Sequence, residues 1–178
     1  RGKNPSEDKQ LIKNLLNSKK EEAELDMITD LVRNDLGRIC ETGSVEVNAN
    51  RIIETYSHVH HTMSNVQGVL KPNINLKDIL KAIFPGGSIT GCPKIRTIQI
   101  INKLEDKDRD IYCGSAGYID SRGNMDFNIM IRTILAHRDG FETHLYFHSG
   151  GGITIDSDPE QEWEETLHKA EAIKQSII

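Results

Sequence analysis

The first part of the chain carries apolar residues at helical spacing. In residues 6–18, leucines and isoleucines recur three and four positions apart after a serine that can cap a helix. Residues 19–39 continue the same pattern over a longer stretch, which Gly37 or Gly43 would end. The pattern predicts two successive amphipathic helices.

The pattern changes between Ser44 and Leu70, where Val, Ile, Thr and Tyr become frequent and predict two strands. A short helix is expected over residues 75–84, closed by a Pro-Gly-Gly turn. Pro93 suits the first position of another helix, since apolar residues recur at helical spacing after it as far as Leu104.

The second half of the chain is dominated by strand-like stretches separated by turns. Strands are predicted within residues 111–120, 125–138 and 141–158, the last of which is expected to hold two strands interrupted by Gly150–Gly152. A final helix is expected to begin with Asp158 as its cap and Pro159 at its first position.

Strand pairs joined as hairpins alternate with single helices along the chain. This order favours an α+β fold with antiparallel or mixed sheets over a doubly wound parallel sheet. At 178 residues the chain fits one domain, or a large part of one. Because two helices lead straight into strands, we expect earlier strands of the same sheet to lie outside this sequence.

Composition narrows the class of protein. Hydrophobic residues make up 37% and charged residues 28%, an ordinary balance for a soluble protein, and no apolar run is long enough to cross a membrane. The net charge of −5 argues against a nucleic-acid partner. Three separate cysteines without a CxxC pair disfavour disulfides and a thiolate zinc site, so a reducing cytoplasm is the expected compartment.

The glycine-rich stretch FPGGSITGCPKIR, residues 84–96, is the first candidate for chemistry. Gly86 and Gly91 have the spacing of a Walker loop, but Cys92 and Pro93 stand where that loop needs Lys and Ser or Thr. A nucleotide site is therefore excluded. A turn that leads into a helix can still offer free amides to an anion, or it can be an ordinary turn.

Two acidic pairs form the second candidate. Glu21 and Glu24 are three residues apart on an expected helix, as are Glu162 and Glu165, so each pair shares a helix face. Four carboxylates would suit Mg²⁺, which prefers oxygen ligands. The alternative is two solvated helix faces, since the chain contains 27 acidic residues.

Other candidates are weaker. In the segment His58–His61, His58 and His60 would share one face of a strand and His61 the other, with no patterned partners for zinc. Arg132 in an apolar strand could bind a carboxylate or face water. Gly150–Gly152 would let a ligand approach the backbone closely or would form a bulge. Together these features indicate a pocket for a small polyanion.

The order of the motifs along the chain strongly resembles that of the chorismate-utilising enzymes, which include anthranilate, aminodeoxychorismate, isochorismate and salicylate synthases. The resemblance covers nearly all 178 residues, and PGGSITG is most similar to the version in the aminodeoxychorismate synthase component I branch. The motifs are AELDMITDLVRNDLGRI, GSVEV, YSHVHHTMS, FPGGSITGCPKIR, YCGSAGYID, FNIMIRT and SGGGITIDSDPEQEWEETLHKA.

The resemblance implies a layered α/β/β/α fold with two packed, mostly antiparallel sheets. It makes residues 1–178 the C-terminal portion of a chorismate-binding catalytic domain, whose N-terminal part would be absent. It implies Mg²⁺ as cofactor, with four ligands that hold it directly or through water: Glu21, Glu24, Glu162 and Glu165.

The resemblance also implies roles for the remaining candidates. Arg132 would bind the enolpyruvyl carboxylate of chorismate with the amides of Gly150, Gly151 and Gly152, and Tyr112 would lie near that group. The active-site histidine would be His61. Ser88 and Gly91 would line the ring pocket, and Lys94 would cap the same edge.

The implied reaction adds ammonia from a separate glutamine amidotransferase subunit to chorismate, giving 4-amino-4-deoxychorismate for para-aminobenzoate and folate synthesis. The alternatives are anthranilate synthase component I, then isochorismate or salicylate synthase, which use water. A non-catalytic binding module is disfavoured, because the acidic pairs, Arg132 and the glycine turns are intact. The branch-specific lysine of a P-I-K-G-T motif is expected just before Arg1, so these residues alone are not expected to be active.

Overall fold

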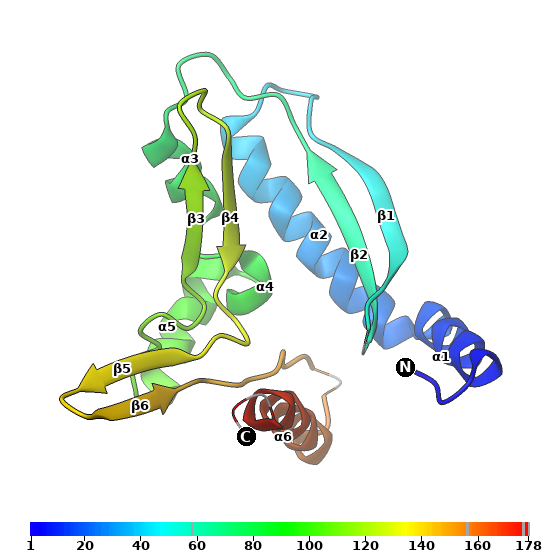
Figure 1. The fold of residues 1–178 in the computed structure, drawn as a ribbon. Helices are drawn as coiled ribbons and strands as arrows, with labels where there is room; N and C mark the ends of the chain where they lie inside the picture. Colours follow the sequence, from blue (N-terminus) through cyan, green and yellow to red (C-terminus); the bar gives the residue numbers. More distant parts are fainter. Residues whose placement is uncertain (58, 156, 176, 178) are drawn as a thin grey trace. The chain divides into compact units, whose positions relative to one another are not determined.

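A computed structural model describes residues 1–57, 59–155, 157–175 and 177 (Figure 1). The chain divides into two compact units, Arg1–Arg96 and Thr97–Ile178. His58, one of the candidates in the histidine segment, lies outside the described residues. None of the described helices is long and apolar enough to cross a membrane.

Two successive helices open the first unit, as predicted: α1 (Pro5–Asn17) and α2 (Lys19–Ile39). The cap of α1 is Asn4, whose side chain accepts from the amides of Ser6 and Glu7. A cap at Ser6 is wrong, because Pro5 already occupies the first helical position, where its missing N–H costs nothing. Ser18 ends α1 and caps α2 by accepting from the amide of Glu21 at 3.3 Å.

The two strands expected between Ser44 and Leu70 are confirmed as an antiparallel hairpin, β1 (Glu46–Thr55) and β2 (His60–Gln67). The register shifts twice along β1, where Arg51 has a left-handed backbone with φ of 52°. Figure 1 shows α2 running alongside this hairpin.

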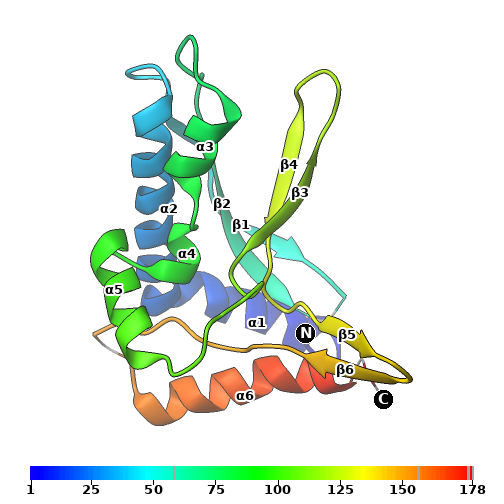
Figure 2. The same cartoon turned by 90° about the vertical axis from the view of Figure 1, so that its left-hand side faces the viewer.

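Short helices complete the first unit. Asn75 and Asp78 form a capping box at the start of α3 (Leu76–Ile83). The one-turn helix α4 (Gly87–Thr90) occupies part of the glycine-rich stretch, and both α3 and α4 lie against α2 (Figure 2). The buried cluster of this unit consists of Ile39, Cys40 and Ala82, surrounded by Leu36, Val45, Ile74, Ile79 and Ile83.

Helix α5 (Lys94–Leu104) contains the boundary between the two units. It begins one residue after Pro93, so the proline precedes the helix and does not open it. The predicted helix is otherwise confirmed.

Two hairpins follow in the second unit. They pair β3 (Ser115–Ile119) with β4 (Met125–Ile129) and β5 (Leu135–Asp139) with β6 (Glu142–Tyr146), all antiparallel. The expected strand over residues 125–138 is broken into two. The strand expected after Gly152 is wrong, since three successive glycines have no side chains to pack and lose more entropy than other residues in a strand.

The last helix is α6 (Pro159–Gln175), with Asp158 as its cap: the Asp158 carboxylate accepts from the amide of Gln161 at 3.0 Å. Its buried positions include Glu162, Ala170 and Ile173. Every strand pair in the described part of the chain is antiparallel, and helices and strands are mixed along it. The α+β class is therefore confirmed.

Candidate functional site

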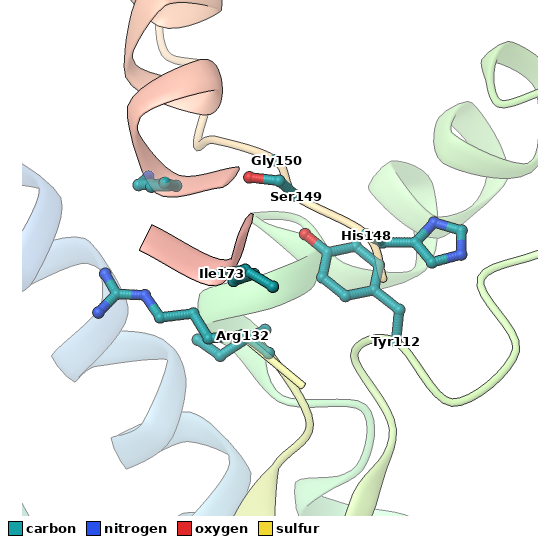
Figure 3. A pocket seen from close by; sticks show the side chains of 8 residues that line it. Tyr112, Arg132, His148, Ser149, Gly150 and Ile173 are labelled. Atoms are coloured by element: carbon teal, nitrogen blue, oxygen red, sulfur yellow. The ribbon is translucent and has the colours of Figure 1, made fainter. Parts of the chain in front are cut away.

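A cavity of about 130 Å³ in the second unit brings together three of the predicted site residues, Tyr112, Arg132 and Gly150 (Figure 3). These residues come from the turn before β3, the segment between β4 and β5, and the loop before α6. The other lining residues are Ile131, His148, Ser149, Lys169 and Ile173. Gly151 and Gly152 follow directly along the chain without lining the cavity.

The Tyr112 ring has two neighbours, an imidazole and a guanidinium. The ring stacks on His148 with centroids 5.3 Å apart, and the Arg109 guanidinium lies 5.7 Å from the ring centroid. Burial raises the pKa of the Tyr112 hydroxyl above its ordinary value, so the group stays protonated and can donate at neutral pH. Figure 3 shows this hydroxyl directed toward Ser149 and Gly150.

Gly150 lies close to Tyr112, with little room for a larger residue. A Cβ atom at this position would lie 3.0 Å from the Tyr112 hydroxyl oxygen, closer than ordinary contact. The neighbouring Ser149 hydroxyl donates to the carbonyl of Thr166 at 3.0 Å, which fastens the loop to α6. The glycine backbone thus lies close to Tyr112, and the approach of a ligand to Gly150–Gly152 stays a prediction.

Arg132 does not lie in a strand, contrary to the sequence prediction. Its φ of 50° is left-handed, and the hydroxyl of Thr133 donates to the carbonyl of Ile131 at 2.9 Å across the bend. Such a backbone is uncommon for a residue with a side chain and costs free energy, so the strand ends there. Figure 3 shows the exposed Arg132 guanidinium extended away from the Tyr112 hydroxyl.

The acidic pair on α6 has two different environments. Glu162 is buried, with 5% of its surface exposed, and its carboxylate accepts from the Ser157 hydroxyl at 2.7 Å. Its second oxygen would lie 3.4 Å from a Cβ placed on Gly151. Glu165 is exposed and pairs with Lys169 at 2.6 Å. Sequence spacing placed both carboxylates on one helix face but could not distinguish their burial.

The second acidic pair lies in the first unit, on α2. Glu21 is exposed, and the Glu24 carboxylate lies 3.9 Å from the ammonium of Lys20. Within the described residues, no group of three or more His, Cys, Asp or Glu side chains is gathered as a metal ion would need. Two of the four glutamates belong to each unit, and all four offer carboxylate oxygens, the donors that suit Mg²⁺. The magnesium site stays a prediction.

His61 and its neighbour His60 point to opposite faces of β2, as the strand periodicity predicted. His61 is exposed and stands opposite Glu54 in the hairpin register. His60 has a buried side chain, bonded to the Asp8 carboxylate at 3.0 Å. Hydrogen bonds from Arg1 and from the amide of Gly2 hold the pKa of Asp8 well below its usual range.

The predicted residues of the glycine-rich stretch also belong to the first unit. Ser88 is exposed within α4, and Gly91 ends that helix with φ of 101°, a left-handed value that favours glycine. The Lys94 ammonium bonds the Asp35 carboxylate at 2.5 Å. Lys94, the first residue of α5, is thus bonded to α2 through Asp35, a residue that the sequence did not indicate.

Sequence reasoning missed His148 and Lys169 as lining residues. Lys169 follows Glu165 by four positions on α6, a spacing that brings the two side chains together, and this signal was available. His148 had no signal, because its stacking on Tyr112 joins residues far apart in the sequence.

Tyr112 and His148 also line a second cavity, of about 310 Å³. Its wall includes Arg109, which forms two hydrogen bonds to the Glu105 carboxylate, at 2.6 and 2.8 Å. These bonds lower the pKa of Glu105 and raise that of Arg109, while burial raises the pKa of the Cys113 thiol nearby. The Glu105 carboxylate and the Arg109 guanidinium therefore both stay charged near neutral pH.

The sequence pattern of the chorismate binding enzyme family matches residues 1–175. The chain belongs to this family. It is 52% identical to an anthranilate synthase component I-like protein from Synechocystis, over 97% of this chain and 35% of that protein. It is 49% identical to anthranilate synthase component 1 from Aquifex aeolicus, over 99% of this chain and 35% of that protein. It is 46% identical to aminodeoxychorismate synthase component 1 from Bacillus subtilis, over 99% of this chain and 37% of that protein.

The fold agrees with that assignment. The crystal structure of anthranilate synthase component I from Streptococcus pneumoniae superposes with a TM-score of 0.81 at 39% identity, over 94% of this chain and 38% of that one. A 2,3-dihydroxybenzoate-specific isochorismate synthase from Bacillus anthracis has the same TM-score at 25% identity, over 99% of this chain and 46% of that one. The chain spans about a third of the length of the curated relatives named above. The family resemblance seen in the motifs is confirmed.

Proposed function

We propose that the protein aminates chorismate to 4-amino-4-deoxychorismate, as component I of an aminodeoxychorismate synthase. Ammonia would come from a glutamine amidotransferase subunit. The observation that carries the proposal is the cavity of the second unit, where Tyr112, Arg132 and Gly150 meet although each was predicted from a separate motif. The PGGSITG spelling of the glycine-rich stretch favours this branch of the family.

The cavity suits a carboxylate of the substrate. Arg132 and Lys169 line its wall, and the Lys169 ammonium pairs with Glu165. The Arg132 guanidinium, which extends away from the Tyr112 hydroxyl, would turn toward a bound carboxylate and hold it through two parallel hydrogen bonds. The protonated Tyr112 hydroxyl is a third donor, and the glycine backbone at residue 150 leaves room beside it. We assign the enolpyruvyl carboxylate of chorismate to this cavity.

Magnesium is part of the proposal. Glu21, Glu24, Glu162 and Glu165 are the carboxylates that would hold the ion, which when bound neutralises a substrate carboxylate and helps the ring hydroxyl to leave. The Ser157 hydroxyl donates to Glu162 and keeps that buried carboxylate oriented. His61, whose imidazole is exposed on β2, is proposed as the acid–base group near the site of ring substitution.

A second candidate is anthranilate synthase component I. Relatives with that name or a name like it reach 52% and 49% identity, against 46% for the aminodeoxychorismate synthase of Bacillus subtilis. Both reactions aminate chorismate, so the cavity supports either. The products differ, because anthranilate has lost the pyruvate unit that 4-amino-4-deoxychorismate retains.

The test incubates the natural, full-length protein with chorismate, ammonium and Mg²⁺ and identifies the product by mass spectrometry. We expect 4-amino-4-deoxychorismate, and no turnover after the divalent cation is removed with EDTA. Anthranilate with free pyruvate would establish the second candidate. Isochorismate, an isomer of chorismate that must be separated from it by chromatography, or salicylate would overturn both.

The role of the cavity is tested with Arg132→Lys. Because hydrogen bonds to charged groups contribute about 1.5–3 kcal/mol each, loss of the two-bond geometry should lower kcat/KM for chorismate about 10- to 100-fold. Arg122→Lys is the matched control, since Arg122 is an exposed arginine on the β3–β4 turn. Equal activity of the two variants would contradict the assignment of Arg132.

A further inference from the structure

One face of α2 carries the glycine-rich stretch. Glu24, Ile28, Leu31 and Asp35 follow one another at four, three and four positions, so they form a single stripe along the helix. All four are buried or half-buried, whereas Met27, Asp30 and Asn34 are exposed. The stripe is therefore part of the packed face of α2, which over this length also includes Leu25, Thr29 and Val32.

The first contact on this stripe is made by Gly87, the first residue of α4. A Cβ atom at Gly87 would lie 2.9 Å from the Cβ and 3.1 Å from the Cδ1 of Leu31, closer than side chains tolerate. Gly87 is buried. The backbone of the glycine-rich stretch thus rests directly on α2 at this point.

The second contact lies one helical turn further along α2. The Lys94 ammonium donates to the Asp35 carboxylate at 2.5 Å, and only 16% and 9% of the two side chains are exposed. Such an ion pair is shielded from water, and removing one partner leaves the other charged and buried. Lys94 begins α5, so this pair fixes the end of the stretch opposite to Gly87.

Ser88 and Gly91, the two residues predicted to line the ring pocket, lie between these contacts. The same helix carries Glu24, whose distance from Asp35 along the axis is about 16 Å at 1.5 Å per residue. An α-helix of this length is rigid, so α2 holds the carboxylates at one end and the glycine-rich stretch at the other in fixed register.

We infer that Asp35 is a positioning residue: through Lys94 it sets where Ser88 and Gly91 stand relative to the acidic pair on α2. This inference rests on the proposed function for its catalytic consequence. It gives Lys94 a different role from that of a substrate ligand, since the ammonium is engaged by a carboxylate of the protein.

The experiment uses the natural, full-length protein with Asp35→Asn, Lys94→Met and the double variant. Misplacement of catalytic groups by about 1 Å costs about 100-fold in rate, so each single variant should lower kcat/KM for chorismate about 10- to 100-fold. The double variant should lose no more than the worse single variant, because both act through one contact. Asp35→Glu, which keeps the carboxylate, should recover part of the loss.

Amide hydrogen exchange without chorismate supplies the second measurement. Residues 86–91 should lose protection in all three variants, and this result does not depend on which reaction the protein catalyses. If the wild-type protein shows no turnover while the variants lose protection at residues 86–91, the proposed function is contradicted and the positioning role of Asp35 is retained. If Asp35→Asn does not fold, the exchange of Lys94→Met decides alone.

Asp30→Asn is the matched control on the same helix. Asp30 is exposed and pairs with Arg33 at 2.9 Å, so its loss should change neither kcat/KM nor exchange at residues 86–91. Two outcomes overturn the inference. One is full activity of Asp35→Asn beside a loss in Lys94→Met, which makes Lys94 a substrate ligand. The other is unchanged exchange at residues 86–91 in Lys94→Met.

Discussion

The two units of the chain differ in how each is stabilised internally. In the first unit, Ile39, Cys40 and Ala82 are buried at the meeting point of α2 and α3, and further apolar side chains pack around them. In the second unit, every residue of β3, β5 and β6 is exposed. Large apolar side chains such as Tyr118 and Leu145 are among them.

The difference shows how each unit positions functional side chains. The first unit places its acidic pair, Glu21 and Glu24, on a helix whose end is anchored by a core, so the positions of these carboxylates depend on packing. The second unit builds its cavity from ring stacking, hydrogen bonds and glycine approaches, because an isolated two-stranded hairpin buries little surface of its own. Substitutions should therefore destabilise the two units through different mechanisms.

The largest effect is expected from Ile39→Ala in the first unit. Ile39 is 5% exposed, and truncation of a buried isoleucine to alanine costs about 2–5 kcal/mol through lost burial and the cavity left behind. The measurement is urea unfolding followed by amide exchange in residues 1–96. Ile119→Ala is the matched substitution in β3, where the side chain is 48% exposed, and its cost should be a small fraction of that. An equal loss of unfolding free energy at the two positions would contradict the view that only the first unit depends on a buried core.

A smaller effect is expected from Gly117→Ala in the second unit. A Cβ atom there would run into the carbonyl oxygen of Asp126 on the paired strand β4. Overpacking costs about 1–3 kcal/mol, and here the clash is with backbone that cannot rotate away. Amide exchange within β3 and β4 should accelerate.

The control for this substitution is Gly37→Ala on α2, which has open space around its Cβ position. It should stabilise the helix by about 0.8–1 kcal/mol, the difference in helix propensity between the two residues. Unchanged exchange in the β3–β4 hairpin of Gly117→Ala would mean that this hairpin tolerates a displaced backbone.

Elements with a clear period were predictable from the sequence. The amphipathic helix α2, the β1–β2 hairpin and the capping of α6 by Asp158 follow from local patterns and agree with the structure. The break at Arg132 did not follow, because IMIRTI has the composition of a strand and only the left-handed backbone at Arg132 interrupts it. The strand expected after Gly152 did not follow either, and the contact of Gly150 with Tyr112 joins distant parts of the sequence.

The candidate site was predictable as a set of residue types and less so as an arrangement. Motif order supplied Tyr112, Arg132 and Gly150, which the structure brings to one cavity. Spacing could not tell that Glu162 is buried while Glu165 pairs with Lys169. It also missed Asp35, because an ion pair between residues 35 and 94 leaves no periodic trace in a single sequence.

The smallest effect concerns the turn of the β3–β4 hairpin, which polar contacts hold without a core. The Asp120 carboxylate accepts from the side chains of Arg122 and Asn124 and from both their amides, and these bonds lower its pKa, with the Arg122 side chain contributing most. Because the folded pKa lies below the ordinary value of about 3.9, the stabilisation is present at neutral pH and is lost as pH falls through the folded pKa.

NMR titration of the Asp120 carboxyl should give a midpoint below that of an unperturbed aspartate, and exchange in β3 and β4 should accelerate as that group protonates. Arg122→Gln removes the largest contribution, so the midpoint should move back toward the ordinary value while β1 and β2 are unaffected. Asp120 is at the surface, where water and salt screen the interaction, so the change in stability should be well below that of the core substitution. A midpoint that is insensitive to Arg122→Gln would show that the amides of the turn, and not the guanidinium, hold the carboxylate, and would leave backbone geometry as the main stabiliser of this hairpin.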